Sequence, residues 1–380
     1  MSATLAPAGG RPFADYAALN ASEIRERTWN AKRALGERVV ILGHHYQRES
    51  VIEFADFRGD SLKLAQLASA RGDAEFIVFC GVHFMAESAD VLRQPHQTVV
   101  LPDLKAGCSM ADMASMEDVE EAWDRLQAAH GDTIVPVTYM NSTAALKAFC
   151  GAHGGLVCTS SNARAVLEWA WARKQRVFFF PDQHLGRNTA YAMGVPLAAM
   201  PEWDWRAEDL ERANVAARAP ETKLVLWRGF CSVHTKFTRQ QIDELRAADP
   251  AVKVLVHPEC PFEVVQAADA VGSTEYIIAQ VQGAAPGTSW AIGTEIHLVQ
   301  RLAQEHPEQH IRSLQKNVCP CATMNRIDPA HLLWCLDNLA MGHVVNAVRV
   351  PEAQRRDAKV ALDRMLELKA QGGIRDMARD

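Results

Sequence analysis

The sequence predicts an α/β protein with three similar three-layer α/β/α domains, whose parallel sheets are arranged about a pseudo-threefold axis. Three observations support this prediction: apolar runs alternate with helical segments, a polar triplet recurs at strand ends, and a cysteine follows each recurrence. Strands that alternate with helices form parallel sheets through right-handed crossovers. Self-similarity along one chain indicates repeated structural units.

Short β-branched and aromatic runs have the length expected for buried parallel strands. They occupy residues 39–42, 76–79, 134–137, 177–180, 224–226 and 252–256. Between them, residues 61–70, 162–171 and 261–270 carry apolar side chains at helical spacing. This alternation of strands and helices predicts the fold class.

A polar triplet ends one predicted strand in each repeat, and a hydroxyl residue follows it at the start of a helix. The triplets are His44-His45-Tyr46, Tyr139-Met140-Asn141 and His257-Pro258-Glu259, and the hydroxyl residues are Ser61, Ser160 and Thr274. The distance is 17 positions from His44 to Ser61, 19 from Asn141 to Ser160 and 17 from His257 to Thr274. Spacings this similar indicate three copies of one α/β unit.

A cysteine closes each unit. Cys108 lies 47 positions after Ser61, Cys231 lies 71 after Ser160, and Cys321 lies 47 after Thr274. The middle unit therefore carries an insertion, which we place at residues 192–217. The repeat predicts α/β units over residues 20–115, 116–234 and 235–325, and C-terminal helices over residues 326–380 that pack back on the core.

Three cysteines at equivalent positions can form one ligand set at the predicted axis. Cys108 and Cys231 lie in turns that contain glycine, where the backbone can approach a metal group closely. Taken singly, each cysteine could instead be a buried thiol. Three thiolates fit a [4Fe–4S] cluster with one open iron, which favours Lewis-acid chemistry over electron transfer. The third ligand lies in the Cys319/Cys321 pair, and the spacing favours Cys321.

The triplets and hydroxyl residues fall where open α/β sheets collect their ligands. Ser61, Ser160 and Thr274 could simply cap helices, but three helix starts aimed at one centre would bind a multiply anionic substrate. His257 and Glu259 are two apart, so their side chains share one face of a strand and can meet one substrate. Histidine, tyrosine and glutamate side chains suit proton transfer.

Composition excludes several classes of function. The 380 residues carry a net charge of −6 and no apolar run of 18 residues, so we expect neither nucleic-acid binding nor a membrane span. The N-terminal residues lack the apolar stretch of a secretory signal. Nine cysteines spread over a long chain favour a reducing cytoplasm over a disulfide framework.

Many short motifs in fixed order resemble those of the quinolinate synthase family, the iron–sulfur enzymes of NAD biosynthesis. The matching stretches include HHYQ at 44–47, GDSL at 59–62, GVHFMAE at 81–87, LPD at 101–103, GC at 107–108, CTSSN at 158–162, PDQHLG at 181–186, GFC at 229–231 with His234, HPEC at 257–260, VGST at 271–274 and GTE at 293–295. The resemblance covers roughly residues 35–345.

The resemblance implies that iminoaspartate condenses with dihydroxyacetone phosphate to give quinolinate, phosphate and two waters. It implies that Cys108, Cys231 and Cys321 hold the cluster. The residues that match carboxylate- and phosphate-binding positions are His44, Ser61, Tyr139, Asn141, Ser160, His257 and Thr274. Those that match proton-transfer positions are Tyr46, His234 and Glu259. It also implies small-molecule substrates and a functional link to an aspartate-oxidising enzyme.

Two alternatives remain open at this point. Another [4Fe–4S]-dependent dehydratase would share the open iron but would need no phosphate site. An iron–sulfur sensor or carrier would require a fourth protein ligand or a partner surface, and it would leave the polar side chains at the strand ends without a role.

Overall fold

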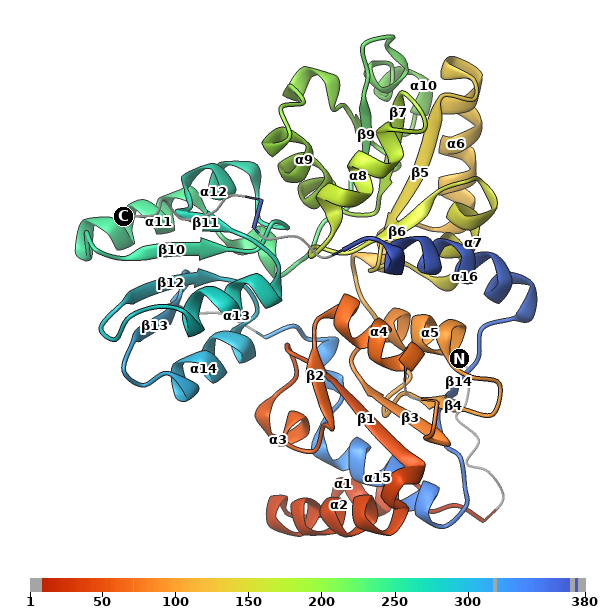
Figure 1. The fold of residues 1–380 in the computed structure, drawn as a ribbon, viewed down its shortest axis with the longest axis vertical. Helices are drawn as coiled ribbons and strands as arrows, with labels where there is room; N and C mark the ends of the chain where they lie inside the picture. The colour runs from red at the N-terminus through yellow and green to blue at the C-terminus, as the bar shows by residue number, and fades with distance from the viewer. Residues whose placement is uncertain (1–8, 71, 317–319, 370–372, 375–380) are drawn as a thin grey trace. The chain divides into compact units, whose positions relative to one another are not determined.

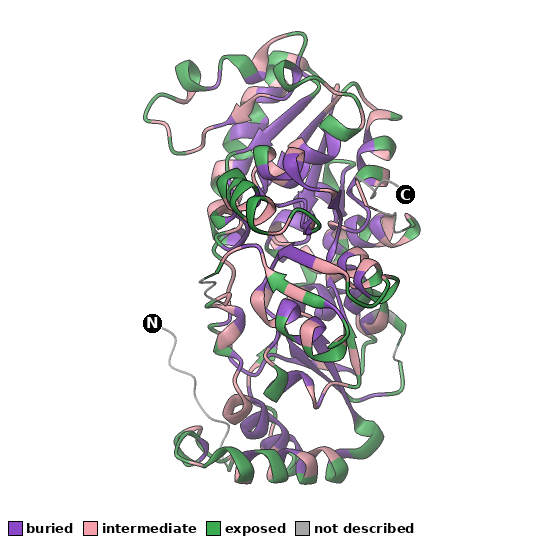
Figure 2. Ribbon diagram, turned by 90° about the vertical axis from the view of Figure 1, so that its left-hand side faces the viewer, coloured by how far each residue is buried: buried purple, intermediate pink, exposed green. Residues whose placement is uncertain are grey.

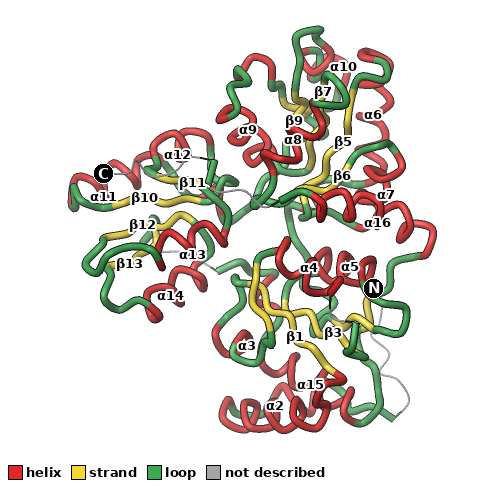
Figure 3. Tube along the Cα trace, viewed as in Figure 1, coloured by secondary structure: helices red, strands yellow, loops and turns green. Residues whose placement is uncertain are grey.

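The structure is a computed structural model that describes residues 9–70, 72–316, 320–369 and 373–374. Helices and strands alternate along the chain, and the described strands form three mostly parallel sheets flanked by helices (Figures 1 and 3). The predicted α/β class is therefore confirmed. The chain divides into two compact units, residues 1–108 with 321–352 and residues 109–320 with 353–380. The predicted domain boundaries stay predictions.

The first unit contains one five-stranded sheet in the order β14-β4-β3-β1-β2. Its strands are β1 (Val39–His44), β2 (Phe57–Gly59), β3 (Phe76–Cys80), β4 (Thr98–Val100) and β14 (Ala347–Val348), of which only β14 pairs antiparallel. Its helices are α1 (Ala14–Ala17), α2 (Ala21–Leu35), α3 (Glu49–Ile52), α4 (Ser61–Ala70), α5 (His83–Leu92) and α15 (Pro329–Ala340). Helix α15 packs beside α2 (Figure 1). Residues 321–352, far along the chain, thus complete the unit that residues 1–108 begin.

The second unit contains two sheets. In the first of them, β5 (Ile134–Tyr139), β6 (Leu156–Cys158), β7 (Arg176–Phe180), β8 (Glu202–Trp203) and β9 (Leu224–Trp227) run parallel in the order β6-β5-β7-β9-β8. The flanking helices are α6 (Met116–His130), α7 (Ala144–Ala152), α8 (Ala163–Trp171), α9 (Gln183–Ala192) and α10 (Leu210–Ala213).

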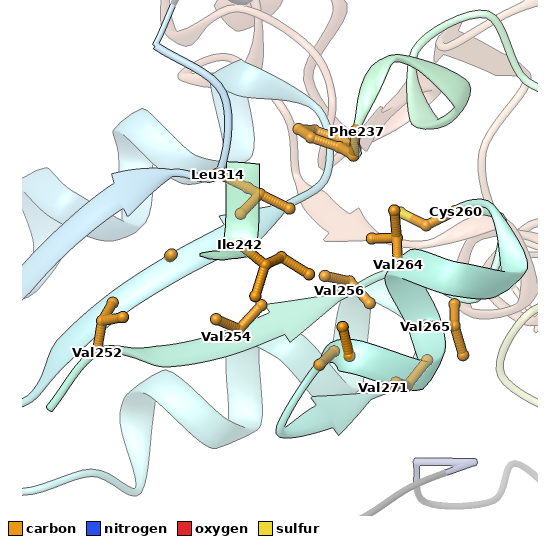
Figure 4. Close-up of a cluster of buried hydrophobic side chains, with 13 residues drawn as sticks. Phe237, Ile242, Val252, Val254, Val256, Cys260, Val264, Val265, Val271 and Leu314 are labelled. Atoms are coloured by element: carbon orange, nitrogen blue, oxygen red, sulfur yellow. The ribbon is translucent and has the colours of Figure 1, made fainter. Parts of the chain in front are cut away.

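The other sheet of the second unit has the parallel order β11-β10-β12-β13. Its strands are β10 (Lys253–Val256), β11 (Ala270–Val271), β12 (Ser289–Gly293) and β13 (His310–Ser313), and its helices are α11 (Arg239–Ala248), α12 (Phe262–Ala267), α13 (Thr274–Gln282) and α14 (Ile296–Glu305). Figure 4 shows its core, in which valines of β10 pack against Ile242 of α11 and against Cys260 just beyond the strand.

The predicted repeat has a counterpart in sheet topology. Leaving out the edge strands β14 and β8, the sheets read β2-β1-β3-β4, β6-β5-β7-β9 and β11-β10-β12-β13, so each has its first strand second from the edge. The register pairs His44 with Gly59 and Tyr139 with Cys158. The paired residue in both cases lies two positions before the predicted hydroxyl. The register thus aligns Tyr139, rather than Asn141, with His44.

The predicted insertion lies where the middle unit is longer than the others. Four residues separate α14 from β13, whereas η3 (Leu197–Ala199), β8, α10 and η4 (Ala216–Arg218) all lie between α9 and β9. The insertion adds β8 to the edge of the sheet, where Trp203 pairs with Trp227. It extends the sheet without changing the order of the strands shared with the other repeats.

Burial follows the layers of each unit. Figure 2 shows largely buried strands, whereas the helices expose their outer faces. Helix α16 (Glu352–Glu367) completes the second unit, and Ala358, Ala361, Leu362 and Met365 of this helix are fully buried. Gly151 of α7 permits this close approach, because a Cβ atom there would lie 1.9 Å from the carbonyl oxygen of Asp357. Among the described residues, no helix combines the length and apolarity needed to cross a membrane.

Candidate active site

The three predicted cysteine ligands share one local structure. A short 3₁₀ helix begins three residues after each cysteine: η2 (Ala111–Met113) after Cys108, η5 (His234–Lys236) after Cys231 and η6 (Met324–Arg326) after Cys321. An α-helix then starts eight residues after each cysteine, at Met116, Arg239 and Pro329. Its N-cap side chain, from Ser115, Thr238 or Asp328, accepts a backbone N–H in every case. This recurring structure supports the equivalence inferred from spacing.

Exposure separates these cysteines from the other described ones. Cys108, Cys231 and Cys321 are half-buried. The remaining five described cysteines are 0% exposed: Cys80, Cys150, Cys158, Cys260 and Cys335. Burial raises the pKa of the Cys80 thiol to about 12, so this cysteine stays protonated at neutral pH. The alternative ligand Cys319 lies outside the described residues.

Two histidines at equivalent strand ends share one hydrogen-bonding arrangement. The backbone N–H of Tyr46 donates to His44 Nδ1 at 3.1 Å, and the backbone N–H of Glu259 donates to His257 Nδ1 at 3.4 Å. Because Nδ1 accepts, the neutral ring carries its proton on Nε2. Both imidazoles, each at most 4% exposed, can therefore donate a hydrogen bond to an anionic ligand from Nε2.

Glu259 is the centre of a buried hydrogen-bonded cluster in the second unit. Its Oε1 accepts the hydroxyl of Tyr139, which ends β5, and its Oε2 pairs with His234 Nδ1 at 2.9 Å. The other ring nitrogen of His234 lies 3.2 Å from Thr294 Oγ1, just beyond β12. The rings of His234 and His257 stack with centroids 4.6 Å apart. Residues from the ends of three strands, β5, β10 and β12, and from one 3₁₀ helix thus converge.

Two members of the cluster, Glu259 and His257, have shifted pKa values. Burial alone would raise the pKa of Glu259, but the neighbouring His234 and His257 and the hydrogen bonds from His234 and Tyr139 outweigh it and lower that pKa to about 2. Burial lowers the pKa of His257 to about 3. At neutral pH the site therefore combines an ionised carboxylate with a neutral His257 imidazole.

The predicted hydroxyl residues do not act as the helix caps. Asp60 caps α4, since its Oδ1 accepts the N–H of Lys63 at 2.9 Å, and Ser273 caps α13 by accepting the N–H of Tyr276 at 3.3 Å. Ser61 and Thr274 are the first helical residues. Ser160 lies in the turn before α8, whose N-cap position is Asn162. The simpler interpretation as caps is therefore wrong for all three.

The described contacts join some predicted site residues and leave others apart. Tyr139, His234, His257 and Glu259 form the buried cluster just described. Asn141, Ser160 and Thr274 belong to the same unit, as does Cys231. The first unit contributes a separate set: His44, Tyr46, Ser61, Cys108 and Cys321. Within it, the rings of His44 and Tyr46 meet edge to face at 4.8 Å.

Three buried polar residues near the cluster were not among the predicted catalytic, binding or metal-ligating residues. Thr294 is 0% exposed and contacts His234; its signal was the GTE motif after a strand. Asp182 is also fully buried, and burial followed by the charge of Glu259 raises its pKa well above the usual range. Buried Lys147 donates to the carbonyl oxygens of Met140 and Ser142, which flank Asn141. A lysine within an apolar helix gave no such signal.

These features define a class of protein: an α/β enzyme with a buried Glu–His–Tyr cluster of side chains that suit acid–base chemistry and with a half-buried thiol, Cys231, beside it. The ligand atoms of Cys231, His234 and Glu259 lie within 4.8 Å of one another, so the acid–base groups and one of the thiols are neighbours. Burial, opposite charges and perturbed pKa values together mark a functional site.

Comparison with known proteins assigns the family. The family model described as quinolinate synthetase A protein (NadA) matches residues 26–367. Quinolinate synthase of Geobacillus kaustophilus is 54% identical over 353 residues, 93% of this chain and 95% of that protein. The enzymes of Corynebacterium glutamicum (54% identity, 93% of this chain and 90% of that protein) and Bacillus subtilis (52%, 93% and 95%) are similarly close. The chain belongs to the quinolinate synthase family.

Proposed function

We propose that this chain condenses iminoaspartate with dihydroxyacetone phosphate to form quinolinate, phosphate and two waters, as a step of NAD biosynthesis. The observation that carries the proposal is the buried cluster of Glu259, His234, Tyr139 and Thr294, built beside Cys231 in a chain of this family. A condensation with two dehydrations requires repeated proton transfers at one place, and this cluster supplies acid–base groups there.

His234 and Glu259 are proposed to move protons together. The carboxylate holds the ring through Nδ1 and stabilises its protonated form, as acidic partners of catalytic histidines do. Tyr139 keeps the carboxylate oriented through its hydroxyl. The half-buried Tyr46 is proposed to act as a further proton donor next to His44. Because the cluster is shielded from water, the reactive imine would be protected from hydrolysis.

Substrate anions are proposed to bind at the strand ends and helix starts. His44 and His257 would donate from Nε2, because Nδ1 of each ring already accepts a backbone N–H. Ser61 and Thr274 would donate their hydroxyls from the first turns of α4 and α13, where backbone N–H groups also favour an anion. Asn141, held between two carbonyls bound by Lys147, and Ser160 would complete the set for carboxylates and phosphate.

A [4Fe–4S] cluster held by Cys108, Cys231 and Cys321 is proposed as the cofactor. The donor set fits, because these three thiols are half-buried and each is followed by the same kind of turn. The other described thiols are fully buried. Within the second unit, Ser109 Oγ and Ser232 Oγ, one residue after Cys108 and Cys231, lie 3.5 Å apart. When bound, the cluster would supply an open iron that acts as a Lewis acid on a substrate oxygen.

We further propose that the three α/β units lie about a pseudo-threefold axis and that the chain works in the cytoplasm, where thiol ligands stay reduced. Iminoaspartate hydrolyses readily, so an aspartate-oxidising enzyme is proposed as its source. The shared strand order of the three sheets supports the proposed pseudo-threefold arrangement. The fully buried thiols are compatible with the proposed location in the cytoplasm.

The test starts from the full chain purified without oxygen. Iron and sulfide are measured, and quinolinate is quantified after incubation with iminoaspartate and dihydroxyacetone phosphate. We expect about four irons and four sulfides per chain, with quinolinate formed only when both substrates are present. A reaction without dihydroxyacetone phosphate is the matched control.

Each other outcome removes a defined part of the proposal. A chain with iron and sulfide that forms no quinolinate would be another dehydratase or a sensor. A chain that forms quinolinate without iron would retain the reaction and lose the cofactor. A chain with neither would contradict both.

A further inference from the structure

Asp103 and Arg326 form an ion pair that connects two of the cysteine-bearing segments within the first unit. Arg326 Nε donates to Asp103 Oδ2 at 2.8 Å across a sequence separation of 223 residues. Asp103 lies five residues before Cys108, and Arg326 lies five residues after Cys321 and ends η6. The Asp103 side chain is only 9% exposed. A charge pair with one buried partner is better shielded from solvent than an ordinary surface pair.

The same carboxylate shapes the turn that leads to Cys108. Its Oδ1 accepts the N–H of Lys105 at 2.9 Å, while the Asp103 carbonyl accepts the N–H of Ala106 at 3.0 Å. The Ala106 carbonyl in turn accepts the N–H of His83, the first residue of α5, at 2.7 Å. The Asp103 side chain therefore sets the conformation of the turn before Cys108. It also holds η6, the helix after Cys321, through Arg326.

The η6 helix is also held from the end of β1. Gln47, which is 0% exposed, donates to the Met324 carbonyl at 3.2 Å, and Arg48 donates to the Asn325 carbonyl at 2.6 Å. The Asn325 N–H donates to the Cys321 carbonyl at 3.0 Å, so the cysteine is tied to the anchored helix. In this way Cys321 is positioned by contacts with the segments that contain His44 and Cys108.

A related contact occurs after Cys108. Met113, the last residue of η2, accepts the indole N–H of Trp227 at 2.8 Å through its carbonyl, and Trp227 lies four residues before Cys231. The 3₁₀ helix after Cys108 is thus bound to the segment before Cys231. In the same way, the 3₁₀ helix after Cys321 is bound to the segment before Cys108. The contact at η6 differs because it depends on a pair of charges.

We propose that Asp103 and Arg326 are positioning residues that fix Cys108 and Cys321 relative to each other, and that they determine how firmly the iron–sulfur cluster is retained. This inference rests on the proposed function, since it assumes that both cysteines are ligands. Residues that orient a metal ligand without touching the metal typically change the metal affinity 10- to 100-fold when they are removed.

The test measures cluster loss in Asp103→Asn, Arg326→Gln and the double variant, each purified without oxygen. An iron chelator is added, and the decay of the visible cluster absorption is followed. We expect loss about 10- to 100-fold faster in Asp103→Asn. Arg326→Gln should lose the cluster faster than the wild type but more slowly than Asp103→Asn, because His331 Nε2 also lies 3.9 Å from Asp103. The double variant should be no worse than Asp103→Asn, since the two side chains act as one unit.

The matched control is Glu75→Gln, which breaks the exposed Arg38–Glu75 pair in the same unit. Its rate of cluster loss should equal that of the wild type. Unfolding of the cluster-free proteins is measured in parallel, because a purely structural role would lower stability without changing cluster loss selectively. Rates in the Asp103 and Arg326 variants equal to the Glu75→Gln rate would overturn the inference. A wild-type chain without iron would overturn the proposed cofactor as well.

Discussion

Glu259 carries a negative charge in a place from which water is excluded, and this is the central chemical fact of the site. An isolated buried carboxylate would take up a proton, because the low dielectric penalises its charge. Here a tyrosine hydroxyl and two histidines reverse that tendency and bring its pKa to about 2. The residue therefore acts as a fixed negative charge that can stabilise a protonated His234.

Replacing Glu259 by glutamine removes that charge while keeping the size of the side chain. We predict that Glu259→Gln retains the cluster and the fold but loses about 100- to 10,000-fold in kcat, because His234 no longer has an ionised partner. Quinolinate formation and visible absorption are measured together. Glu263→Gln, in the first turn of α12, serves as the control. A Glu259→Gln enzyme with wild-type kcat would rule out the proton-transfer role.

His257 predicts a particular pH dependence of stability. Its pKa is about 3 in the folded chain and near 6.5 when unfolded, because burial disfavours its charged form. Between these values the unfolded state binds a proton that the folded state lacks. Stability from this group is therefore complete above pH 6.5 and is lost as the pH falls toward 3, by at most about 1.4 kcal/mol per pH unit.

Denaturant unfolding between pH 6.5 and 5 checks this sign, since ordinary carboxylates titrate mostly below that range. We expect His257→Gln to show a shallower loss of stability on acidification than the wild type. His310→Gln, at an exposed position of β13, should keep the wild-type slope. Equal slopes in the two variants would contradict the shifted titration of His257.

Local periodicity predicts which side chains share a face, but it cannot predict partners from other strands. His257 and Glu259 were paired from their spacing of two, and both are buried members of the cluster. Tyr139 donates a hydrogen bond to the Glu259 carboxylate, although it lies 120 positions earlier in the chain. That contact depends on how two sheets of the second unit pack, which no sequence spacing expresses.

At the scale of elements, the same turn follows Cys108, Cys231 and Cys321. A 3₁₀ helix, an N-cap and an α-helix follow at constant offsets, although the residue types differ. The spacing of 47 residues indicated equivalent cysteines, and the common turn is its structural counterpart. The Asp103–Arg326 pair had no such signal, because single charged residues are common along any sequence.

Thr238 is the N-cap of α11 and forms a capping box with Gln241, in which each side chain accepts a hydrogen bond from the other's backbone N–H. We predict that Thr238→Ala lowers the free energy of unfolding by about 1 kcal/mol, since one helix N–H loses its acceptor. Equilibrium denaturant unfolding measures the change. Thr238→Ser keeps the hydroxyl and should stay close to the wild type. Equal stabilities for the alanine and serine variants would show that the cap contributes nothing.

At the scale of the whole molecule, alternation and repetition in the sequence predicted three α/β sheets. Counting showed that the middle unit carries an insertion, and composition indicated its place, where η3, β8, α10 and η4 lie. The sequence did not predict which unit each C-terminal element joins. Helix α15 and strand β14 complete the first unit, while α16 completes the second. Apolar faces on these elements show that they are covered, but the sequence does not say by which unit.

The proposed ligand set draws on both units, because Cys108 and Cys321 lie in the first unit and Cys231 lies in the second. We predict that replacing any one of them by serine lowers the iron content from about four per chain to nearly none, because a cluster with three protein ligands tolerates no loss. Cys260→Ser, at a fully buried position beside Glu259, should keep its iron. Cys319→Ser should keep it too, since spacing favours Cys321. Iron and sulfide analysis of the five variants decides the set: loss in Cys319→Ser with retention in Cys321→Ser would exchange the third ligand, and retention in all of them would refute a three-cysteine site.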